Sequence, residues 1–453
     1  MENKKELSRR RFLSNTAMGA MGAMGTIGAL GLLEACSGSE KKRNEVEVPV
    51  LLNEAPDGKV LKAGLIGCGS RGTGAAINFI DAGPNLKIVA LGDVFQDRLA
   101  SCRAALKKER NIEIDDTKCF TGFDSYQKVI DSGVDIVLLC TPPHFRPLHV
   151  EAAVNAGKHI FMEKPVAVDP AGARSVLISS KKAAQMGLSM VSGTIRRVQK
   201  DYMETWRRVA NGEIGEIVGA NIVRNGGSSW SKKRLPEWTD MEYMLRNWPN
   251  FCWLSGDHIV EQFIHEVDVM NWFVGKIPVK AMGWGGRQRR ISGDQYDFFS
   301  VQYIYDNGMQ THCAARQING CSNLKREIIT GTKGFADCNG TIFDLKGNPV
   351  WKYKYPKEGD TDLTWKVKDP YVQEHINLVA AIRSGIPIND AEAQVNSTLI
   401  TIMGRISAYT GKDVTWEEML NSNLTLGPKS YAMGPVPNIP ETAPVIGVEV
   451  KSI

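Results

Sequence analysis

The sequence predicts an α/β protein whose first domain is a doubly wound parallel sheet. Its 453 residues suffice for two domains. Near residue 60 an apolar run leads directly into a glycine-rich turn, and short apolar runs then alternate with helix-like segments as far as residue 192. This alternation is typical of a parallel sheet with helices on both faces, so we expect residues 60–192 to form that domain.

Composition excludes several classes of function. Hydrophobic residues make up 43% of the chain, enough for a full core. The formal net charge is +5, and no dense Lys/Arg block lies beyond the N-terminus, so a nucleic-acid partner is not expected. The nine cysteines form no C-x-x-C pair and have no histidine at ligand spacing, which argues against a metal site and a disulfide framework.

Residues 1–36 have the features of an export signal. A basic start with Arg9–Arg11 precedes a mildly apolar stretch, rich in Gly, Ala and Met, from 17 to 33. Residues 8–13 resemble the twin-arginine consensus at nearly every position, so we expect the Tat translocase to export the chain to the periplasm. An ordinary membrane-anchor helix is the alternative, although the apolar run is short and glycine-rich.

The end of this segment, Leu33-Glu34-Ala35-Cys36, resembles a lipobox. Cys36 would then be the lipidation site and would anchor the protein to the membrane. Glu34 departs from the small or apolar residue usual at its position, and cleavage nearby by an ordinary signal peptidase is the alternative. Residues 37–59 have the Lys/Glu/Pro-rich composition of a flexible linker.

The glycine-rich turn has the pattern G-x-G-x-x-G. It follows an expected strand at 60–66 and precedes a helix-like segment at 75–80. Glycines at this spacing permit a tight turn and a close approach of the backbone to a pyrophosphate at the helix N-terminus, which indicates a Rossmann domain. The expected cofactor-binding residues of the turn are Gly67, Gly69, Ser70, Arg71 and Gly72.

Asp93 ends the second expected strand, about 20 residues past the last glycine. An acidic side chain at this point holds the ribose hydroxyls of the adenosine half. Because a carboxylate disfavours a 2′-phosphate, we expect NAD rather than NADP. A plain glycine turn that binds no nucleotide is the alternative.

Two later strands, at 135–140 and 158–162, are also followed by polar residues. Doubly wound folds bind their ligands at the carboxyl ends of the strands. The further cofactor contacts expected there are Thr141, Pro142, His144, Glu163 and Lys164.

Together these motifs resemble the glucose–fructose oxidoreductase/inositol dehydrogenase (Gfo/Idh/MocA) family. The triplet Glu163-Lys164-Pro165 is the most specific of them, and the resemblance extends over about residues 61–416. It implies that residues 193–430 form an α/β substrate domain with a large, mainly antiparallel sheet, followed by an extended tail at 431–453. The same sheet would join subunits if the protein forms a homo-oligomer. The segments expected to form this domain are strands at 218–224, 279–284, 298–305 and 309–316 and a helix at 371–384.

A helix expected at 258–274 carries the candidate catalytic residues. His258, Glu261, His265 and Asp268 fall within about 80° of one another at 100° per residue, opposite an apolar face. A carboxylate beside a histidine can orient the ring and tune its proton affinity. A solvated polar face is the alternative. The family has Asp where Glu261 stands, which puts the role of this acid in doubt.

An insertion at 230–253 precedes this helix and is rich in tryptophan. Sugar rings stack their C–H faces on aromatic rings, so these side chains indicate a carbohydrate site, unless they only pack the loop. The expected substrate contacts are Arg197, His258 and Trp253.

The resemblance implies hydride transfer between a sugar carbon and nicotinamide. Lys164 would bind the reacting hydroxyl, His265 would act as acid/base and Glu261 would support it. Alternatively, Lys164 contacts only a phosphate and His265 is a packed core residue. An exported enzyme has no free NAD pool, so a tightly bound cofactor is expected to be regenerated in each cycle.

Three functions are therefore open. The first is an oxidoreductase acting on a sugar, polyol or glycoside. The second is a redox-neutral, NAD-dependent glycoside hydrolase that works through a transient 3-keto sugar. The third is a non-catalytic, lipid-anchored sugar-binding protein.

Overall fold

The computed structural model describes residues 45–355, 369–437 and 442–447. The chain divides into two units, 1–47 and 48–453, and the fold described below belongs to the second. The predicted export signal and Cys36 lie outside the described residues. Within the described ranges, no helix has the length and apolarity needed to cross a membrane.

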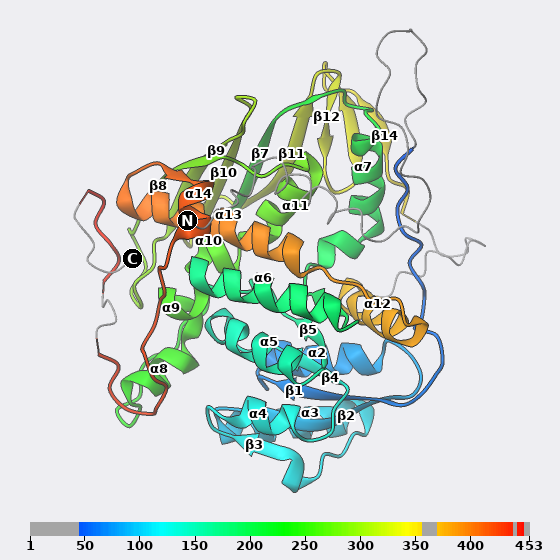
Figure 1. Cartoon of the computed structure of the whole chain (residues 1–453). Helices are drawn as coiled ribbons and strands as arrows, with labels where there is room; N and C mark the ends of the chain where they lie inside the picture. Colours follow the sequence, from blue (N-terminus) through cyan, green and yellow to red (C-terminus); the bar gives the residue numbers. More distant parts are fainter. Residues whose placement is uncertain (1–44, 356–368, 438–441, 448–453) are drawn as a thin grey trace, which may run out of the picture. The chain divides into compact units, whose positions relative to one another are not determined.

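The first sheet has six parallel strands in the order β3-β2-β1-β4-β5-β6 (Figure 1). The order reverses between β1 and β4, which places a ligand crevice at the carboxyl ends of these two strands. The strands are β1 (Leu61–Ile66), β2 (Leu86–Asp93), β3 (Cys119–Thr121), β4 (Ile136–Leu139), β5 (His159–Met162) and β6 (Met190–Ser192).

Helices cover both faces of this sheet, as the alternating pattern predicts. They are α2 (Ser70–Ile80), α3 (Gln96–Arg110), α4 (Ser125–Ile130), α5 (Arg146–Asn155) and α6 (Pro170–Gln185). A later helix, α12 (Pro370–Ser384), also packs here: its Val372 and Ile376 share a core with Leu65 and Phe79. The family resemblance assigns 371–384 to the second domain, whereas its apolar face completes the first.

The second sheet has nine strands in the order β14-β13-β12-β11-β7-β10-β9-β8-β15. All its pairs are antiparallel except β7 with β10, so the predicted α/β class with a mainly antiparallel second sheet is confirmed. The strands are β7 (Ile217–Gly226), β8 (Lys280–Gly286), β9 (Phe298–Ile304), β10 (Gln310–Gln317), β11 (Leu324–Gly331), β12 (Gly334–Asp337), β13 (Thr341–Asp344), β14 (Pro349–Lys352) and β15 (Val414–Thr415).

Two helices pack on one face of the nine-stranded sheet (Figure 1). Helix α11 (Ile264–Val274) contacts β7 and β11, and α13 (Ala391–Thr410) contacts β8 and β9. The first half of α13 also enters the core of the first domain through Val395 and Leu399. This helix therefore fixes the two domains to each other. The remaining helices are α7 (Lys200–Ala210), α8 (Asp240–Arg246), α9 (Cys252–Ser255), α10 (His258–Glu261) and α14 (Trp416–Asn421).

The helix expected at 258–274 is instead two helices, α10 and α11. The amides of Gln262 and Phe263 both donate to the carbonyl of His258, a wider turn that interrupts the regular hydrogen-bond ladder. The expected common polar face is therefore wrong: His258, Glu261 and Asp268 are all buried, and each has a different partner. His258 packs on Phe299, whereas Glu261 and Asp268 each meet a cation from another element, which offsets the cost of burying a carboxylate.

Candidate active site

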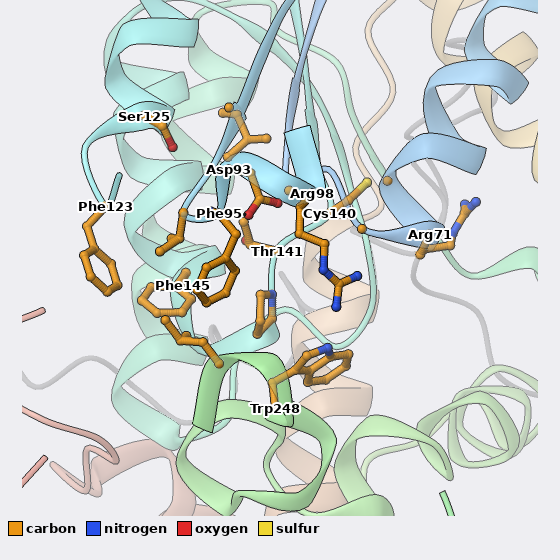
Figure 2. Close-up of a pocket in the computed structure, with 18 of the residues that line it drawn as sticks. Arg71, Asp93, Phe95, Arg98, Phe123, Ser125, Cys140, Thr141, Phe145 and Trp248 are labelled. Atoms are coloured by element: carbon orange, nitrogen blue, oxygen red, sulfur yellow. Dashed lines mark hydrogen bonds between the residues drawn. The ribbon is translucent and has the colours of Figure 1, made fainter. Parts of the chain in front are cut away.

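A cavity of about 580 Å³ lies at the carboxyl ends of β1, β2 and β4 (Figure 2). It is placed at the reversal of strand order, where this architecture binds dinucleotides. The predicted cofactor residues that line it are Gly67, Gly69, Ser70, Arg71, Gly72, Asp93, Thr141 and Pro142.

The glycines of the turn serve different purposes. Gly67 has φ +98°, and a Cβ there would lie 2.7 Å from the backbone of Cys140 and Thr141. A Cβ on Gly72 would lie 1.8 Å from the carbonyl oxygen of Gly67, so both glycines are needed to form the turn. A Cβ on Gly69 would meet only the Arg98 guanidinium at 3.6 Å. Gly69 instead leaves open space in front of the α2 N-terminus, which has no side-chain cap, as a pyrophosphate requires.

Asp93 ties the turn to the end of β2. Its two carboxylate oxygens accept hydrogen bonds from the amides of Cys68 (2.7 Å) and Phe95 (2.9 Å). Burial raises the pKa of this carboxyl, and the two backbone bonds oppose the shift. Asp93 therefore lines the cavity and also holds the backbone of its wall in place. Arg98, which carries no sequence motif, lines the same wall.

The insertion at 230–253 closes over this end of the cavity. Trp230, Lys232, Leu245 and Trp248 all line it, and Figure 2 shows Trp248 on the side opposite the sheet. Two of the tryptophans that we expected to stack on a sugar, Trp230 and Trp248, thus face the predicted adenosine end of the dinucleotide cavity.

Arg246 holds the insertion to the first domain. Its guanidinium donates to both oxygens of Asp97 at 3.0 Å and lies 3.9 Å from the ring centre of Phe95. We call residues 230–248, together with this attachment, the nucleotide clamp.

Helix α12 places residues near the end of β5, and no sequence motif predicts that they lie there. Glu163 pairs with Arg71, and the Arg71 guanidinium lies 4.6 Å from the ring centre of Tyr371. Neighbouring Glu374 is buried, and neither of its carboxylate oxygens has a hydrogen-bond partner among the residues that the structure describes. Burial therefore raises the pKa of Glu374 well above its usual value, with the charge of Glu163 adding to the shift.

Lys164 and Glu261 join the two domains. The Lys164 ammonium lies 3.0 Å from the Glu261 Oε1 and donates to the Glu261 backbone carbonyl at 2.5 Å. Only about a tenth of each side chain is exposed. The Glu261 carboxylate also accepts a hydrogen bond from the side-chain amide of Gln262. Among the described residues these are its partners, so Glu261 is bonded to Lys164 rather than to the His265 ring.

His265 stands one turn further along, at the start of α11, and is partly exposed. Burial by its surroundings lowers the pKa of His265 well below its usual value, and the positive charges of Lys164, Arg196 and Arg224 reinforce the shift. The ring is therefore neutral near pH 7, so one of its nitrogens can accept a hydrogen bond. The structure thus brings Lys164, Glu261 and His265 into one electrostatic cluster.

The three expected substrate contacts lie outside this cluster. His258 is buried with its ring edge-on to Phe299, and Arg197 forms two 2.9 Å hydrogen bonds to Asp268. Trp253 is 2% exposed and packs perpendicular to His144. His144 is itself hydrogen-bonded to Tyr431 of the C-terminal segment at 2.7 Å, and its burial lowers its pKa to about 4.

Two family models match the chain. Residues 61–190 match an oxidoreductase family with an NAD-binding Rossmann fold, and residues 202–337 match the GFO/IDH/MocA C-terminal domain. The chain belongs to the Gfo/Idh/MocA family. It is therefore an oxidoreductase that uses NAD, and the open space at Gly69 and the uncapped α2 N-terminus fit that cofactor.

Relatives of this Gfo/Idh/MocA chain agree with the assignment. Inositol 2-dehydrogenase of Salmonella typhimurium is 27% identical over 348 residues, which are 72% of this chain and 87% of the relative. Two solved structures share its fold. An aldose-aldose oxidoreductase from Caulobacter crescentus has a TM-score of 0.61 at 18% identity, covering 79% of this chain and 99% of the other. A scyllo-inositol dehydrogenase from Lactobacillus casei with bound NAD(H) and scyllo-inositol has a TM-score of 0.58 at 20% identity, covering 79% and 99%.

Proposed function

We propose that the protein is an exported enzyme that transfers hydride between a sugar, polyol or glycoside and a tightly bound NAD. The observation that carries this proposal is the cluster of Lys164, Glu261 and His265, which joins the end of β5 to the start of α11. The inositol 2-dehydrogenase relative supports a polyhydroxylated substrate. When bound, NAD supplies the hydride acceptor or donor.

The side chains of the cluster handle the proton that accompanies the hydride. Oxidation of a carbinol releases the hydride from carbon and the proton from oxygen. The Lys164 ammonium, held by Glu261, is placed to donate a hydrogen bond to the reacting hydroxyl. We assign the His265 ring, which is neutral before the reaction, the role of taking up the hydroxyl proton and returning it in the reverse direction.

The nucleotide clamp supports retention of the cofactor. Trp230, Leu245 and Trp248 cover the cavity at the predicted adenosine end, and Arg246 fastens them to Asp97. An enzyme that keeps its NAD after export through the Tat translocase returns the hydride in each cycle. Lipidation at Cys36 would hold this enzyme at the periplasmic membrane. Oxidation of one sugar with reduction of another and glycoside cleavage through a transient keto sugar both meet this requirement.

The deciding experiment uses purified full-length protein with its bound nucleotide. The nucleotide is released by heat from one sample and identified by mass spectrometry, and the rest is screened with sugars, polyols and glycosides. We expect NAD, and an absorbance change of the bound nicotinamide on adding substrate. Release of aglycone without net reduction would favour the glycoside hydrolase. Binding of sugars with no absorbance change and no product would establish the binding protein instead.

A further inference from the structure

Two positively charged residues lie directly opposite each other on neighbouring strands of the second sheet. Arg224 on β7 and Lys325 on β11 are cross-strand partners, and β7 and β11 lie side by side above α11 in Figure 1. Directly opposed side chains project from the same face, about 5 Å apart, and like charges in this arrangement repel. Their neighbours two positions along, Ile222 and Glu327, are buried, so this is the face that α11 covers.

The pair lies beside His265. The Arg224 guanidinium donates to Glu266 at 2.8 Å and to Gln262 at 3.3 Å, residues that flank His265 in the chain. The charges of Arg224 and Lys325 both act on the His265 ring. The two cations therefore border the cluster assigned to the chemistry.

The carboxylates around this cluster are already paired. Glu261 pairs with Lys164, Glu327 with Arg196, and Glu266 with both Arg196 and Arg224. On this face of the sheet four cations thus face three anions. The next carboxylate whose charge reaches Lys325 is Asp337, and it is the cross-strand partner of Ile328, on the other face. Within the described parts of the chain, Lys325 has no ion-pair partner and is exposed to solvent. Arg224 uses two of its five N–H donors on Glu266 and Gln262, which leaves three. The site therefore holds one uncompensated positive charge and free donors beside it.

We propose that Lys325 and Arg224 bind a carboxylate on the substrate, so that the enzyme acts on sugar acids, of the uronate type, rather than on neutral sugars. This inference rests on the proposed function, because it assigns a substrate class to that same site. A guanidinium and an ammonium together match a carboxylate in charge and geometry. The bound anion also relieves the repulsion between the two opposed cations.

The test compares matched pairs of compounds that differ only in a carboxylate: glucuronate with glucose and galacturonate with galactose. Rapid-mixing measurement of the reduction of the bound NAD gives a single-turnover rate constant and a half-saturating concentration, and tryptophan fluorescence measures binding without turnover. We expect the uronate of the preferred pair to exceed its neutral partner at least tenfold in the ratio of these two quantities. Lys325→Gln should reduce that preference about tenfold through the half-saturating concentration, the usual worth of a charge-assisted hydrogen bond. Lys325→Glu should reduce it further.

Arg326→Gln is the matched control. Arg326 is the next residue on β11, is also exposed, and projects from the opposite face of the sheet. This variant loses the same charge and should keep the preference for uronates. A wild-type preference for neutral sugars, or a preference unchanged by Lys325→Gln, would overturn the inference while leaving the hydride-transfer function intact. If no compound reduces the cofactor, the function fails, and uronate binding weakened by Lys325→Gln alone would still support the anion site. Absence of uronate binding would overturn it.

Discussion

Lys164 and His265 belong to different domains and are expected to share one proton-transfer task. Lys164→Ala and His265→Ala should each lower turnover by roughly 10²–10⁴-fold while the protein stays folded and binds NAD; Lys164→Ala should also lower the melting temperature, because it leaves Glu261 without its cation. The double variant should be far less damaging than the product of the two, because the residues act as a unit. Glu261→Gln should lower turnover by a smaller factor, because Glu261 positions the Lys164 ammonium and does not itself transfer the proton. Near-normal turnover by folded His265→Ala would remove α11 from the mechanism.

Asp294 should give the folded state a distinct pH dependence. Burial raises the pKa of this carboxyl to about 7, whereas an unfolded chain has an ordinary aspartate. The folded protein therefore binds the extra proton between about pH 4 and pH 7, and its stability should fall as the pH rises through that window. At about 1.4 kcal/mol per pKa unit the effect is a few kcal/mol.

The measurement for Asp294 is the urea midpoint at pH 5 and pH 8, for the wild type and for Asp294→Asn. The asparagine oxygen can still accept from the Cys252 amide, which the carboxylate now does at 2.7 Å. The variant should lose much of the difference between the two pH values. An equal difference in both proteins would contradict the assignment.

Among the elements, the nucleotide clamp should control how long NAD stays bound. Arg246→Ala removes two hydrogen bonds to Asp97 and the contact with the Phe95 ring. Together these are worth about 1–2 kcal/mol, so NAD should dissociate about five- to thirtyfold faster. Release is followed by the nucleotide remaining after gel filtration.

The control for the clamp is Arg234→Ala. Arg234 lies in the same insertion, but it pairs with Asp240 inside that insertion and stacks on Tyr243. Its loss removes one cation without detaching the clamp from the first domain. Equal NAD retention by Arg246→Ala and the wild type would show that the insertion does not hold the cofactor.

The elements differ in how well the sequence predicts them. The strands of the first sheet are visible because buried parallel strands are continuous apolar runs. Helix α13 is not visible in the sequence as an amphipathic helix. Its Thr398, Thr401 and Ser407 are buried along with its apolar residues, so it has no polar stripe. In strand β11 the first residue, Leu324, is followed by Lys325, Arg326 and Glu327, a charged run that resembles a loop. Apolar and polar spacing at 258–274 fits one continuous helix, so the spacing does not reveal the break between α10 and α11.

The candidate site divides in the same way. The glycine turn and Asp93 belong to a local motif whose spacing carries its geometry. Arg98, Trp248 and Tyr371 come from three elements far apart in the sequence. No spacing rule connects them, so they could not be predicted.

For the whole molecule, export remains a prediction from residues 8–13. Replacing Arg9 and Arg10 by lysine keeps the charge but removes the arginine pair that the translocase reads, so this variant should stay in the cytoplasm. Cys36→Ser should be exported but released from the membrane. Cell fractionation with antibody detection follows both. Normal export of the lysine variant would argue against the Tat route, and membrane retention of Cys36→Ser against the lipobox.

Helix α12 gives the order in which this chain can be assembled on the ribosome. Its Val372 and Ile376 fill a core otherwise built from residues more than 170 positions earlier, such as Leu65, Phe79 and Phe161. Domains usually fold as units, N-terminal first, while synthesis continues. Here the nascent first domain exposes an apolar face until residue 384 has been made. We therefore expect the NAD site to mature only after nearly the entire polypeptide is translated, and truncation before α12 to leave a fragment prone to aggregate rather than an independent nucleotide-binding module.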